Sequence, residues 1–412
     1  MDRDFDFGAD IMPRLHELAA ISESPEHLTR KYLTDEHRRA NDLVQGWMQG
    51  AGMAVHQDAV GNIVGRYEGA ASGAPALIIG SHLDTVVMAG KYDGMLGIVS
   101  GIECVRSLNA RNVRLPFAVE VIGFADEEGV RFQSTYLGSR ALAGTFDLSL
   151  LERPDRDGVT MADAMRTFGL DPAKIHEAQR RPEDVAAYIE LHIEQGPALE
   201  GRDLAVGAVT AIAGANRLAV VLEGESGHAG TVPMGLRRDA LAAASECVLA
   251  LEEIAAGHKD AAGTVGQLEV SPGASNVIPG SARFTVDLRA PDDAARRGML
   301  AELQAAYRAI AERRRMALRM ETVHEAESVA CADGIISQIG QAIEDEGIRP
   351  FLLPSGAGHD AAAMAALTDV GMIFVRCRGG ISHSPDESIT ERDALAGARV
   401  LLRAIENFAM PG

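Results

Sequence analysis

The sequence predicts an α/β protein with a mostly parallel sheet, into which a second, α+β domain is inserted. Three observations support this fold class. Up to residue 212 and again after residue 328, short apolar runs alternate with amphipathic stretches, a pattern typical of parallel strands covered by helices. Between these parts the predicted order changes to strand, helix, two strands, helix and strand. The chain of 412 residues is also long enough for two hydrophobic cores.

The strands predicted for the parallel sheet are short runs rich in apolar and β-branched residues. They cover residues 76–80, 118–124, 187–192 and 371–376. Between the first two strands, residues 94–111 have the apolar spacing and the length of a helix. The stretch 150–184 is polar and helix-like, and its pattern supports no closer assignment.

The inserted domain is predicted to cover residues 213–328, so that the catalytic domain is discontinuous and consists of residues 1–212 and 329–412. The elements expected within the insertion are strands at 217–225, 264–270, 282–290 and 317–325 and helices at 239–256 and 292–314. Their order, βαββαβ, is that of the ferredoxin-like sandwich, in which helices cover one face of an antiparallel sheet.

Charge and composition restrict the partners that we expect. Acidic residues outnumber basic residues 59 to 39, and the resulting negative charge repels nucleic acids and anionic membrane surfaces. No apolar stretch approaches the ~20 residues of a membrane span, and the N-terminal "MDRDFDFGAD" lacks the apolar segment of a signal peptide. The four cysteines form no CxxC pair and fit reduced thiols. We therefore expect a cytoplasmic protein.

Each strand of the predicted parallel sheet leads to a side chain that can bind a metal ion. In chain order these side chains are His82, Glu127 with Glu128, His192 and His383. Ligands bind outside the carboxyl ends of the strands in open α/β sheets, so we expect these groups to meet in one crevice. Each residue alone is weak evidence, and the inference rests on their shared position.

Asp93 completes the predicted metal site. It lies eleven residues after His82 in "GKYDGMLG", just before a predicted helix, where its carboxylate can reach the same edge of the sheet. The predicted ligands are therefore His82, Asp93, Glu128, His192 and His383. Imidazoles and carboxylates in this combination favour Zn, Mn, Co or Ni. Five ligands are more than one catalytic zinc requires, so we expect two divalent ions ~3.5–4 Å apart, bridged by Asp93.

Two further carboxylates are expected to support the metal site. Asp84, two residues after His82 on an extended chain, is predicted to accept the ring N–H of that histidine and fix its tautomer. In an extended segment the adjacent Glu127 and Glu128 cannot both point at one metal. We expect Glu128 to be the ligand and Glu127 to act on the substrate side as base and acid in turn.

Nine segments of the chain resemble a known family. They are "GSHLDTV", "KYDGMLG", "DEEGVRF", "ELHIEQGP", "SGHAGTVPM", "NVIPG", "DLRAP", "PSGAGHDA" and "ISHSP". Together they resemble the hydantoinase/carbamoylase branch of the M20 metallo-amidohydrolases, which includes N-carbamoyl-L-amino-acid hydrolases, allantoate amidohydrolases and β-ureidopropionases. Many M20 peptidases carry an acidic residue where this chain has His192, so the histidine points to ureido rather than peptide substrates.

The resemblance implies the same di-metal site, with Glu127 as the catalytic acid and base. It also implies that the inserted domain is a mobile lid and the surface of a homodimer. Substrate-binding roles are implied for His228, Asn276 and Arg289 of the inserted domain, and for Gln195, Gly358 and His359. In this family pattern, His228 reaches the active site of the partner subunit and takes part in catalysis. The planar fork of Arg289 is suited to hold a substrate carboxylate through two hydrogen bonds.

The small-molecule substrate stays open among ureido acids, whose carbamoyl group would be released as ammonia and carbon dioxide. Residues 214–217, Gly-Ala-Asn-Arg, differ from the Gly-Gln-Arg-Arg frequent in allantoate hydrolases, whereas "FADEEGVRF" and "GSRALAGTFD" resemble bacterial allantoate hydrolases. Allantoate, N-carbamoyl-L-amino acids and N-carbamoyl-β-alanine are therefore all candidates.

Two functions of other kinds are weighed against hydrolysis of ureido acids. One is an M20-type dipeptidase or aminopeptidase, and His192 argues against it. The other is a non-catalytic metal-binding member of the fold, against which the presence of Glu127 together with all five ligands argues.

Overall fold

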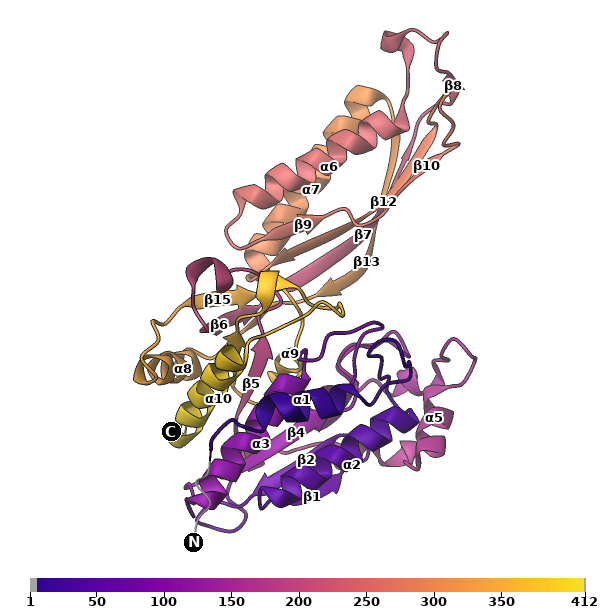
Figure 1. Ribbon diagram of the computed structural model, residues 1–412. Helices are drawn as coiled ribbons and strands as arrows, with labels where there is room; N and C mark the ends of the chain where they lie inside the picture. The colour runs from indigo at the N-terminus through magenta and orange to yellow at the C-terminus, as the bar shows by residue number, and fades with distance from the viewer. Residues whose placement is uncertain (1–5, 411–412) are drawn as a thin grey trace. The chain divides into compact units, whose positions relative to one another are not determined.

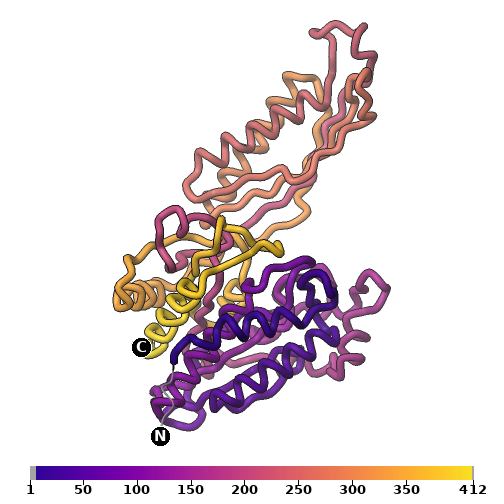
Figure 2. The backbone as a smooth tube through the Cα atoms, in the orientation of Figure 1, coloured from indigo at the N-terminus to yellow at the C-terminus, as the bar shows by residue number. Residues whose placement is uncertain are grey.

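The computed structural model of the protein describes residues 6–410, and these residues divide into two compact units. The first unit consists of the chain up to Thr210, Cys331–Leu353 and the chain from His359 onward. The second consists of Ala211–Ala330 and Pro354–Gly358. In Figure 2 the first unit contains the indigo and magenta N-terminal part, the orange segment 331–353 and the yellow C-terminal part, and the second unit contains most of the pink to light-orange middle part.

The first unit is built around a nine-stranded sheet of order β1-β2-β4-β3-β5-β16-β6-β14, in which β15 also pairs with β6 (Figure 1). The four central strands are parallel to one another: β3 (Ala76–His82), β4 (Ala118–Phe124), β5 (Val185–Ile193) and β16 (Val370–Val375). These are the four predicted strands, so the mostly parallel sheet is confirmed. The strands that were not predicted are β1 (Ala54–Gln57), β2 (Ile63–Tyr67), β6 (Val206–Ile212), β14 (Val329–Ala330) and β15 (Leu352–Ser355).

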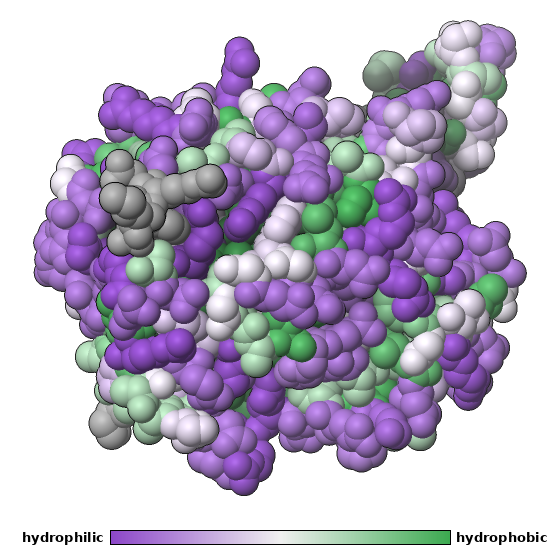
Figure 3. Space-filling model, turned by 60° about the horizontal axis from the view of Figure 1, so that its bottom comes forward, coloured by the Kyte–Doolittle hydropathy of each residue, from purple (hydrophilic) through white to green (hydrophobic). Residues whose placement is uncertain are grey.

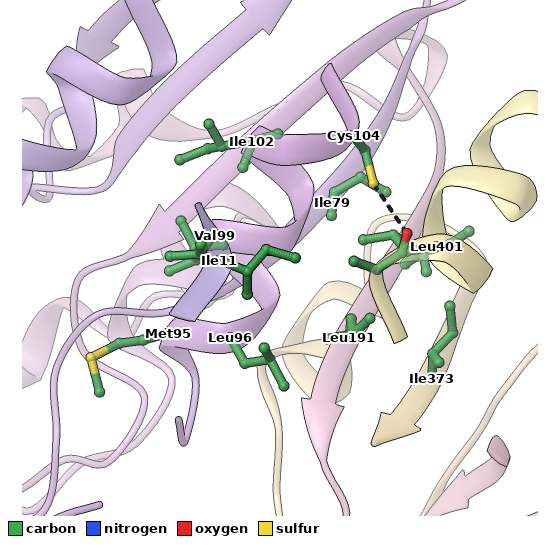
Figure 4. Close-up of a cluster of buried hydrophobic side chains, with 14 of the residues drawn as sticks. Ile11, Ile79, Met95, Leu96, Val99, Ile102, Cys104, Leu191, Ile373 and Leu401 are labelled. Atoms are coloured by element: carbon green, nitrogen blue, oxygen red, sulfur yellow. Dashed lines mark hydrogen bonds between the residues drawn. The ribbon is translucent and has the colours of Figure 1, made fainter. Parts of the chain in front are cut away.

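One face of this sheet packs against long helices. These helices are α1 (Ile11–Ala19), α2 (Asp35–Gly50), α3 (Met95–Ala110), α8 (Asp333–Asp345) and α10 (Glu391–Glu406). Figure 4 shows Ile79, Leu191 and Ile373 of three parallel strands together with side chains of α3 and α10. The buried thiol of Cys104 on α3 donates a hydrogen bond of 3.6 Å to the carbonyl of Ala398 on α10. The predicted helix 94–111 is thus confirmed as a central core helix.

The other face of the sheet carries polar groups and short helices. Successive side chains of a strand point to opposite faces, so Ile189 and Leu191 enter the main core while Glu190 and His192 face away from it. Helices α4 (Leu137–Leu142) and α9 (Asp360–Met364) lie on that side, where the backbone N–H of Ala361 donates to the Glu190 carboxylate at 3.0 Å. Because both faces are covered, all residues of β3 and β4 are buried.

The segments that connect these elements are short helices. The stretch 150–184, for which the sequence supported no assignment, contains η1 (Leu148–Glu152), α5 (Met161–Phe168), η2 (Pro172–Ala178) and η3 (Pro182–Asp184). The remaining 3₁₀ turns are η4 (Glu200–Arg202), η5 (Met234–Leu236) and η6 (Arg378–Gly380).

The second unit is a ferredoxin-like sandwich, as predicted. Its antiparallel sheet has the order β10-β12-β7-β13 and is built from β7 (Gly214–Glu223), β10 (Leu268–Ser271), β12 (Ser281–Ala290) and β13 (Ala317–Ala326). Helices α6 (Ala240–Gly257) and α7 (Asp293–Arg314) pack on the face that carries Leu218, Val220 and Leu222. The strand predicted at 264–270 is instead two strands, β9 (Ala262–Thr264) and β10, which both pair with β12. A separate two-stranded ribbon joins β8 (Gly227–His228) to β11 (Val277–Ile278).

The face in Figure 3 is mostly hydrophilic, and its hydrophobic residues occur in small groups among polar ones. In the part of the chain that the structure describes, no helix combines the length and the apolar character needed to cross a bilayer.

Candidate metal centre

Strand alternation brings two histidines to the same face of the sheet. His82 is the last residue of β3, and His192 lies near the end of the neighbouring β5. Both rings are buried, and each Nδ1 bonds to a backbone carbonyl: His82 to Asp84 at 3.0 Å and His192 to Ile193 at 2.8 Å. Since carbonyl oxygens only accept, these contacts assign the proton to Nδ1 in the neutral ring. Nε2 of each ring is then unprotonated, and Nε2 of His192 accepts the backbone N–H of Gly94 at 3.2 Å.

Asp93 lies at the centre of the site. Its Oδ1 is 3.2 Å from Nε2 of His82 and 3.0 Å from Nε2 of His192. Its Oδ2 is 3.3 Å from Nε2 of His383, which is itself 3.6 Å from Oε1 of Glu128. We call His82, Asp93, Glu128, His192 and His383 the Asp93 cluster. One carboxylate therefore faces two histidines with one oxygen and the third histidine with the other.

The loop that carries Asp93 depends on a glycine. Gly94 has a φ of +74°, and a Cβ at this position would lie 2.6 Å from atoms of the His82 ring. A side chain would therefore be strained by the backbone conformation and would also displace the histidine. The segment "GKYDGMLG" places a carboxylate at the start of α3 only because this residue is small.

The position of Glu127 and Glu128 differs from the expectation. Oxygens of both carboxylates lie within 4.8 Å of each other and of a ring nitrogen of His82. The expectation that they point to different sides assumed an extended chain, but β4 ends at Phe124 and the backbone bends at both glutamates. Either carboxylate can therefore reach the space beside His82. The extended conformation that was assumed is absent, and the separate roles of the two glutamates stay a prediction.

The predicted contact of Asp84 also needs correction. The Nδ1 atom of His82 is closer to the backbone carbonyl of Asp84, at 3.0 Å, than to its carboxylate, at 3.6 Å. The carboxylate instead accepts hydrogen bonds from the backbone N–H groups of Glu127 at 2.8 Å and Glu128 at 3.1 Å. Asp84 thus supports the site by holding the bend that presents the two glutamates.

The buried charges of the site shift one another's pKa values. Burial alone would raise the pKa of Asp93, but the contacts with His192, His383 and His82 hold it well below its usual range. Burial lowers the pKa of His82, yet contacts with Asp93, Glu127 and Asp84 outweigh this and raise it well above 6.5. Burial and the repulsion by Asp93 raise the pKa of Glu128 to about 7. The opposite pKa shifts of Asp93 and His82 mean that the carboxylate and the imidazole attract each other as an ion pair.

Three residues around Asp93 tie its loop to the loop of His383. Gln195, which was predicted to line the pocket, donates from Nε2 to Asp93 Oδ2 at 2.8 Å. Ser382 donates to the same oxygen at 2.8 Å and also lies 2.9 Å from Glu387. Glu387 accepts the backbone N–H groups of Tyr92 at 2.8 Å and Asp93 at 3.2 Å. Glu387 was missed in the sequence, although it follows His383 closely in "SHSPDES".

A second group of buried polar residues lies beside His192. His359, also predicted at the pocket, packs with its ring centroid 4.6 Å from that of His192. Burial and the neighbouring His192 hold the pKa of His359 well below its usual value, so its ring is neutral. Glu190 accepts from Ser81 at 3.0 Å and from Tyr188 at 3.1 Å. Its signal in the sequence was a carboxylate two residues before His192, inside an otherwise apolar strand.

The other predicted substrate-binding residues belong to the second unit. His228 and Asn276 are exposed at the β8–β11 ribbon, where the carbonyl of Asn276 accepts the N–H of Ala229 at 2.9 Å. Arg289 is the residue before the last of β12. It donates from Nε and Nη2 to both oxygens of Asp287, at 2.8 and 3.0 Å, and from Nη1 to the carbonyl of Gly356. Its guanidinium therefore already binds a carboxylate of its own strand. Gly358 also lies in this unit and is partly buried.

The residues at the Asp93 cluster fit a divalent metal ion. Three imidazole nitrogens and several carboxylate oxygens lie within reach of common points, and these groups are largely buried. Imidazole and carboxylate together are a donor set that Zn, Mn, Co and Ni accept. Among the described residues, Oε1 of Gln195, whose Nε2 binds Asp93, is buried and lacks a hydrogen-bond partner. Such a concentration of buried acceptors favours a cation.

Several known proteins are similar to this chain. The sequence matches the peptidase family M20/M25/M40 over residues 78–407. It is 42% identical to an N-carbamoyl-L-amino acid amidohydrolase of Geobacillus stearothermophilus, over 98% of each chain. It is 41% identical to an allantoate deiminase of Arabidopsis thaliana, over 97% of this chain and 82% of the relative. The crystal structure of a hydantoinase/carbamoylase family amidase from Burkholderia multivorans matches with a TM-score of 0.91 and 35% identity, over 97% of both chains.

Proposed function

Because the chain belongs to the peptidase family M20/M25/M40, in its hydantoinase/carbamoylase branch, we propose that it is a metal-dependent hydrolase of ureido acids. The bond that it cleaves is the carbamoyl C–N bond of an N-carbamoyl-L-amino acid or of allantoate, and the products of the carbamoyl group are ammonia and carbon dioxide. We infer these substrates from two relatives, an N-carbamoyl-L-amino acid amidohydrolase and an allantoate deiminase, which are 42% and 41% identical to this chain. The observation that carries the proposal is the arrangement of three histidines around the two oxygens of Asp93.

We propose that the Asp93 cluster holds two divalent ions, Zn, Mn, Co or Ni. His82 and His192 face Oδ1 of Asp93, and His383 with Glu128 lies on the Oδ2 side, so Asp93 is the natural bridge between two sites. When bound, such ions polarise a carbonyl group and make a water molecule acidic.

Glu127 is proposed to move the protons of the reaction. Its carboxylate is buried beside His82, and burial together with the charge of Glu128 raises its pKa well above its usual range. A carboxylate in this position can accept a proton from water at one oxygen and then deliver it to the leaving nitrogen. The bend that Asp84 holds keeps this carboxylate at the site.

The substrate carboxylate is proposed to bind the second unit. Arg289 and Arg217 both donate to Asp287, and this group of three carries one net positive charge in a chain of net charge −20. His228 and Asn276 are proposed to add polar contacts from the β8–β11 ribbon. Gln195, His359 and Gly358 are proposed to line the pocket around the ureido group.

We propose further that the protein is a homodimer formed through the second unit, which acts as a lid, and that His228 serves the active site of the partner subunit. The supporting observation is that β10 and β13 are the outer strands of its sheet, and outer strands invite pairing with a second copy. A reducing compartment such as the cytoplasm is proposed because all four cysteines are buried and unpaired.

A substrate panel tests the proposed function. Protein reconstituted separately with Mn, Co, Ni or Zn is assayed for ammonia release from allantoate, N-carbamoyl-L-amino acids and N-carbamoyl-β-alanine, and for cleavage of a dipeptide set. We expect release of ammonia from at least one ureido acid and no cleavage of dipeptides. Cleavage of dipeptides alone would instead assign a peptidase, and a metal-loaded protein inert toward every substrate would assign a non-catalytic member of the family.

A further inference from the structure

A cavity in the first unit lies outside the Asp93 cluster. It has a volume of about 440 Å³ and is lined by the N-terminal half of α10, by the segment before β6, by the turn after α8 and by Arg376 after β16. None of its lining residues belongs to the Asp93 cluster or to the residues proposed to bind the ureido substrate. Cavities of several hundred Å³ are of the size that small-molecule ligands occupy.

The lining of this cavity is basic, although the whole chain is acidic. Four arginines line it, and the acidic lining residues are Asp203 and Glu346, which leaves a formal charge of four minus two, or +2. The chain as a whole has a net charge of −20. The basic lining residues, which we call the arginine pocket, are Arg349, Arg376, Arg392 and Arg399.

The acidic residues of the lining are already neutralised. Asp203 accepts from Arg376 at 2.8 Å, and Glu346 accepts from Arg403, which lies outside the pocket, at 3.4 Å. Arg376 is further fixed by both oxygens of the buried Asp393, at 3.2 and 2.8 Å. By contrast, the contacts among residues 6–410 include no hydrogen bond or ion pair for the exposed side chains of Arg349, Arg392 and Arg399. Three cations therefore face the cavity without a protein counter-charge.

The spacing of two of these arginines along α10 favours an anion that carries more than one charged group. Arg392 and Arg399 are seven residues apart on α10, so they lie on the same side of the helix about 10 Å apart along its axis. One phosphate is smaller than this spacing, whereas linked phosphoryl groups can span it. The planar guanidinium binds two phosphate oxygens at once. Leu204, Ile348 and Leu395 add apolar lining that an uncharged part of a ligand can contact.

We propose that the arginine pocket binds a small molecule with two or more linked phosphoryl groups, of which a nucleoside diphosphate is the simplest example with an uncharged body. The site does not depend on the proposed hydrolase function, because it shares no residue with the machinery of that reaction.

Calorimetric titration of the metal-loaded, full-length protein tests this proposal. The probes are inorganic pyrophosphate, ADP, inorganic phosphate and citrate, at constant ionic strength and with the free divalent ion held constant by a metal buffer. The Arg392→Gln/Arg399→Gln variant is compared with wild type. The matched control is Arg156→Gln/Arg297→Gln, which removes two exposed arginines elsewhere and thus the same total charge.

We expect one saturable site per chain for pyrophosphate and ADP, and weaker binding of inorganic phosphate and citrate. Loss of two charge-assisted contacts should weaken pyrophosphate binding at least about tenfold in Arg392→Gln/Arg399→Gln, and the control should bind like wild type. Three results would overturn the proposal. The first is equal heats in all three proteins, which would indicate that the probe withdraws the metal. The second is binding of citrate as tight as that of pyrophosphate. The third is the lack of saturable binding at millimolar probe.

Discussion

At the scale of single residues, two adjacent glutamates compete for the same space. Oxygens of Glu127 and Glu128 both lie within 4.8 Å of a ring nitrogen of His82, so distance alone does not separate a ligand from a proton carrier. Their other neighbours differ. Glu128 lies 3.6 Å from His383 on the far side of Asp93, whereas the pKa of Glu127 is raised well above its usual range by burial and by the charge of Glu128.

A pair of conservative substitutions distinguishes the two roles. Glu127→Gln should leave two metal ions per chain bound and reduce kcat by about 10²- to 10⁴-fold, because a proton carrier is lost. Glu128→Gln, the matched control, should reduce metal content. Metal analysis of both purified variants beside kcat gives the answer. If Glu127→Gln empties a metal site while Glu128→Gln retains both ions, the two roles are reversed.

The proposed carboxylate clamp can be tested at Arg289. Arg289→Ala should cost about 2 to 5 kcal/mol of recognition because it leaves a substrate anion without its partner. Arg289→Lys should restore only part of this, since lysine keeps the charge but not the planar fork. The matched control is Arg283→Ala, an exposed arginine on the same strand and the same face of the sheet.

The measurement for Arg289 is kcat/KM with the acid substrate and with its amide analogue, combined in a double-mutant cycle. We expect Arg289→Ala to lower kcat/KM for the amide analogue only slightly, because the analogue has no carboxylate for Arg289 to bind. Additive losses would mean that Arg289 does not touch the substrate carboxylate. Its guanidinium would then serve the contacts that it already makes with Asp287 and Gly356, and Arg217 or His228 would be the next candidate.

At the scale of elements, the site depends on how strand ends and loops are held. β3 and β5 supply His82 and His192 on one face because strand side chains alternate, and the same alternation sends Ile79 and Leu191 into the core. The loops of Asp93 and His383 come from distant parts of the chain, and Glu387 joins them through Tyr92, Asp93 and Ser382.

Helix α2 contains a buried histidine that should make the fold sensitive to acid. The Nδ1 of His37 accepts the N–H of Leu33 at 3.1 Å, so its Nε2 carries the proton and bonds to the carbonyl of Gly61 at 3.2 Å. Burial lowers the pKa of His37 from 6.5 to about 3. Between these values the unfolded chain binds a proton that the folded chain does not, so the free energy of unfolding decreases as the pH falls.

His37→Gln should reduce this pH dependence, because glutamine can still donate to Gly61 but does not titrate. Urea unfolding of metal-free protein at about pH 7 and about pH 5 measures it. The difference in the free energy of unfolding between the two pH values should be smaller in His37→Gln than in wild type. The exposed His16→Gln should behave like wild type. An unchanged pH dependence in His37→Gln would show that other groups dominate the acid response.

At the scale of the whole molecule, the fold does not rest on the metal. The Asp93 cluster lies at strand ends and in loops, whereas the sheet is held by a continuous core of aliphatic side chains from five helices. Removal of metal by a chelator should therefore abolish activity but leave cooperative unfolding in place. Circular dichroism during urea unfolding of the metal-free protein is the measurement. A metal-free protein without a cooperative transition would contradict this expectation.

The proposed homodimer also belongs to this scale. Sedimentation at working concentration should give twice the 43.6 kDa mass of the chain, because the outer strands of the ferredoxin-like sheet can be covered by a two-fold partner. A charged substitution on the outer strand, Thr322→Lys on β13, should weaken the dimer if that edge is used, and Ala305→Lys at an exposed position of α7 is the control with the same change of charge. A monomeric wild type would exclude any contribution of His228 to a second active site.

The sequence alone determined the fold class, because local pattern carries it. Buried parallel strands appear as continuous apolar runs, and the order βαββαβ identifies the second sheet; both are present in the structure. The family was also readable from nine short segments and is confirmed by comparison. The strands β1, β2, β6, β14 and β15, which lie outside the four parallel strands, were not found. β1 and β14 are short and partly exposed and leave little periodic signal, whereas β2 and β6 are mostly buried.

Only the tertiary structure decided how the candidate site is assembled. Sequence pattern indicated which side chains lie at strand ends, and the structure places them around Asp93, although their role as ligands remains a prediction. The sequence pattern did not indicate that Asp84 holds the Glu127–Glu128 bend. It also did not indicate that Glu387 joins two loops almost 300 residues apart in the chain, at Tyr92 and Ser382. The physical reason is that strand periodicity is local, whereas a loop takes its conformation from hydrogen bonds to partners that are remote in the chain.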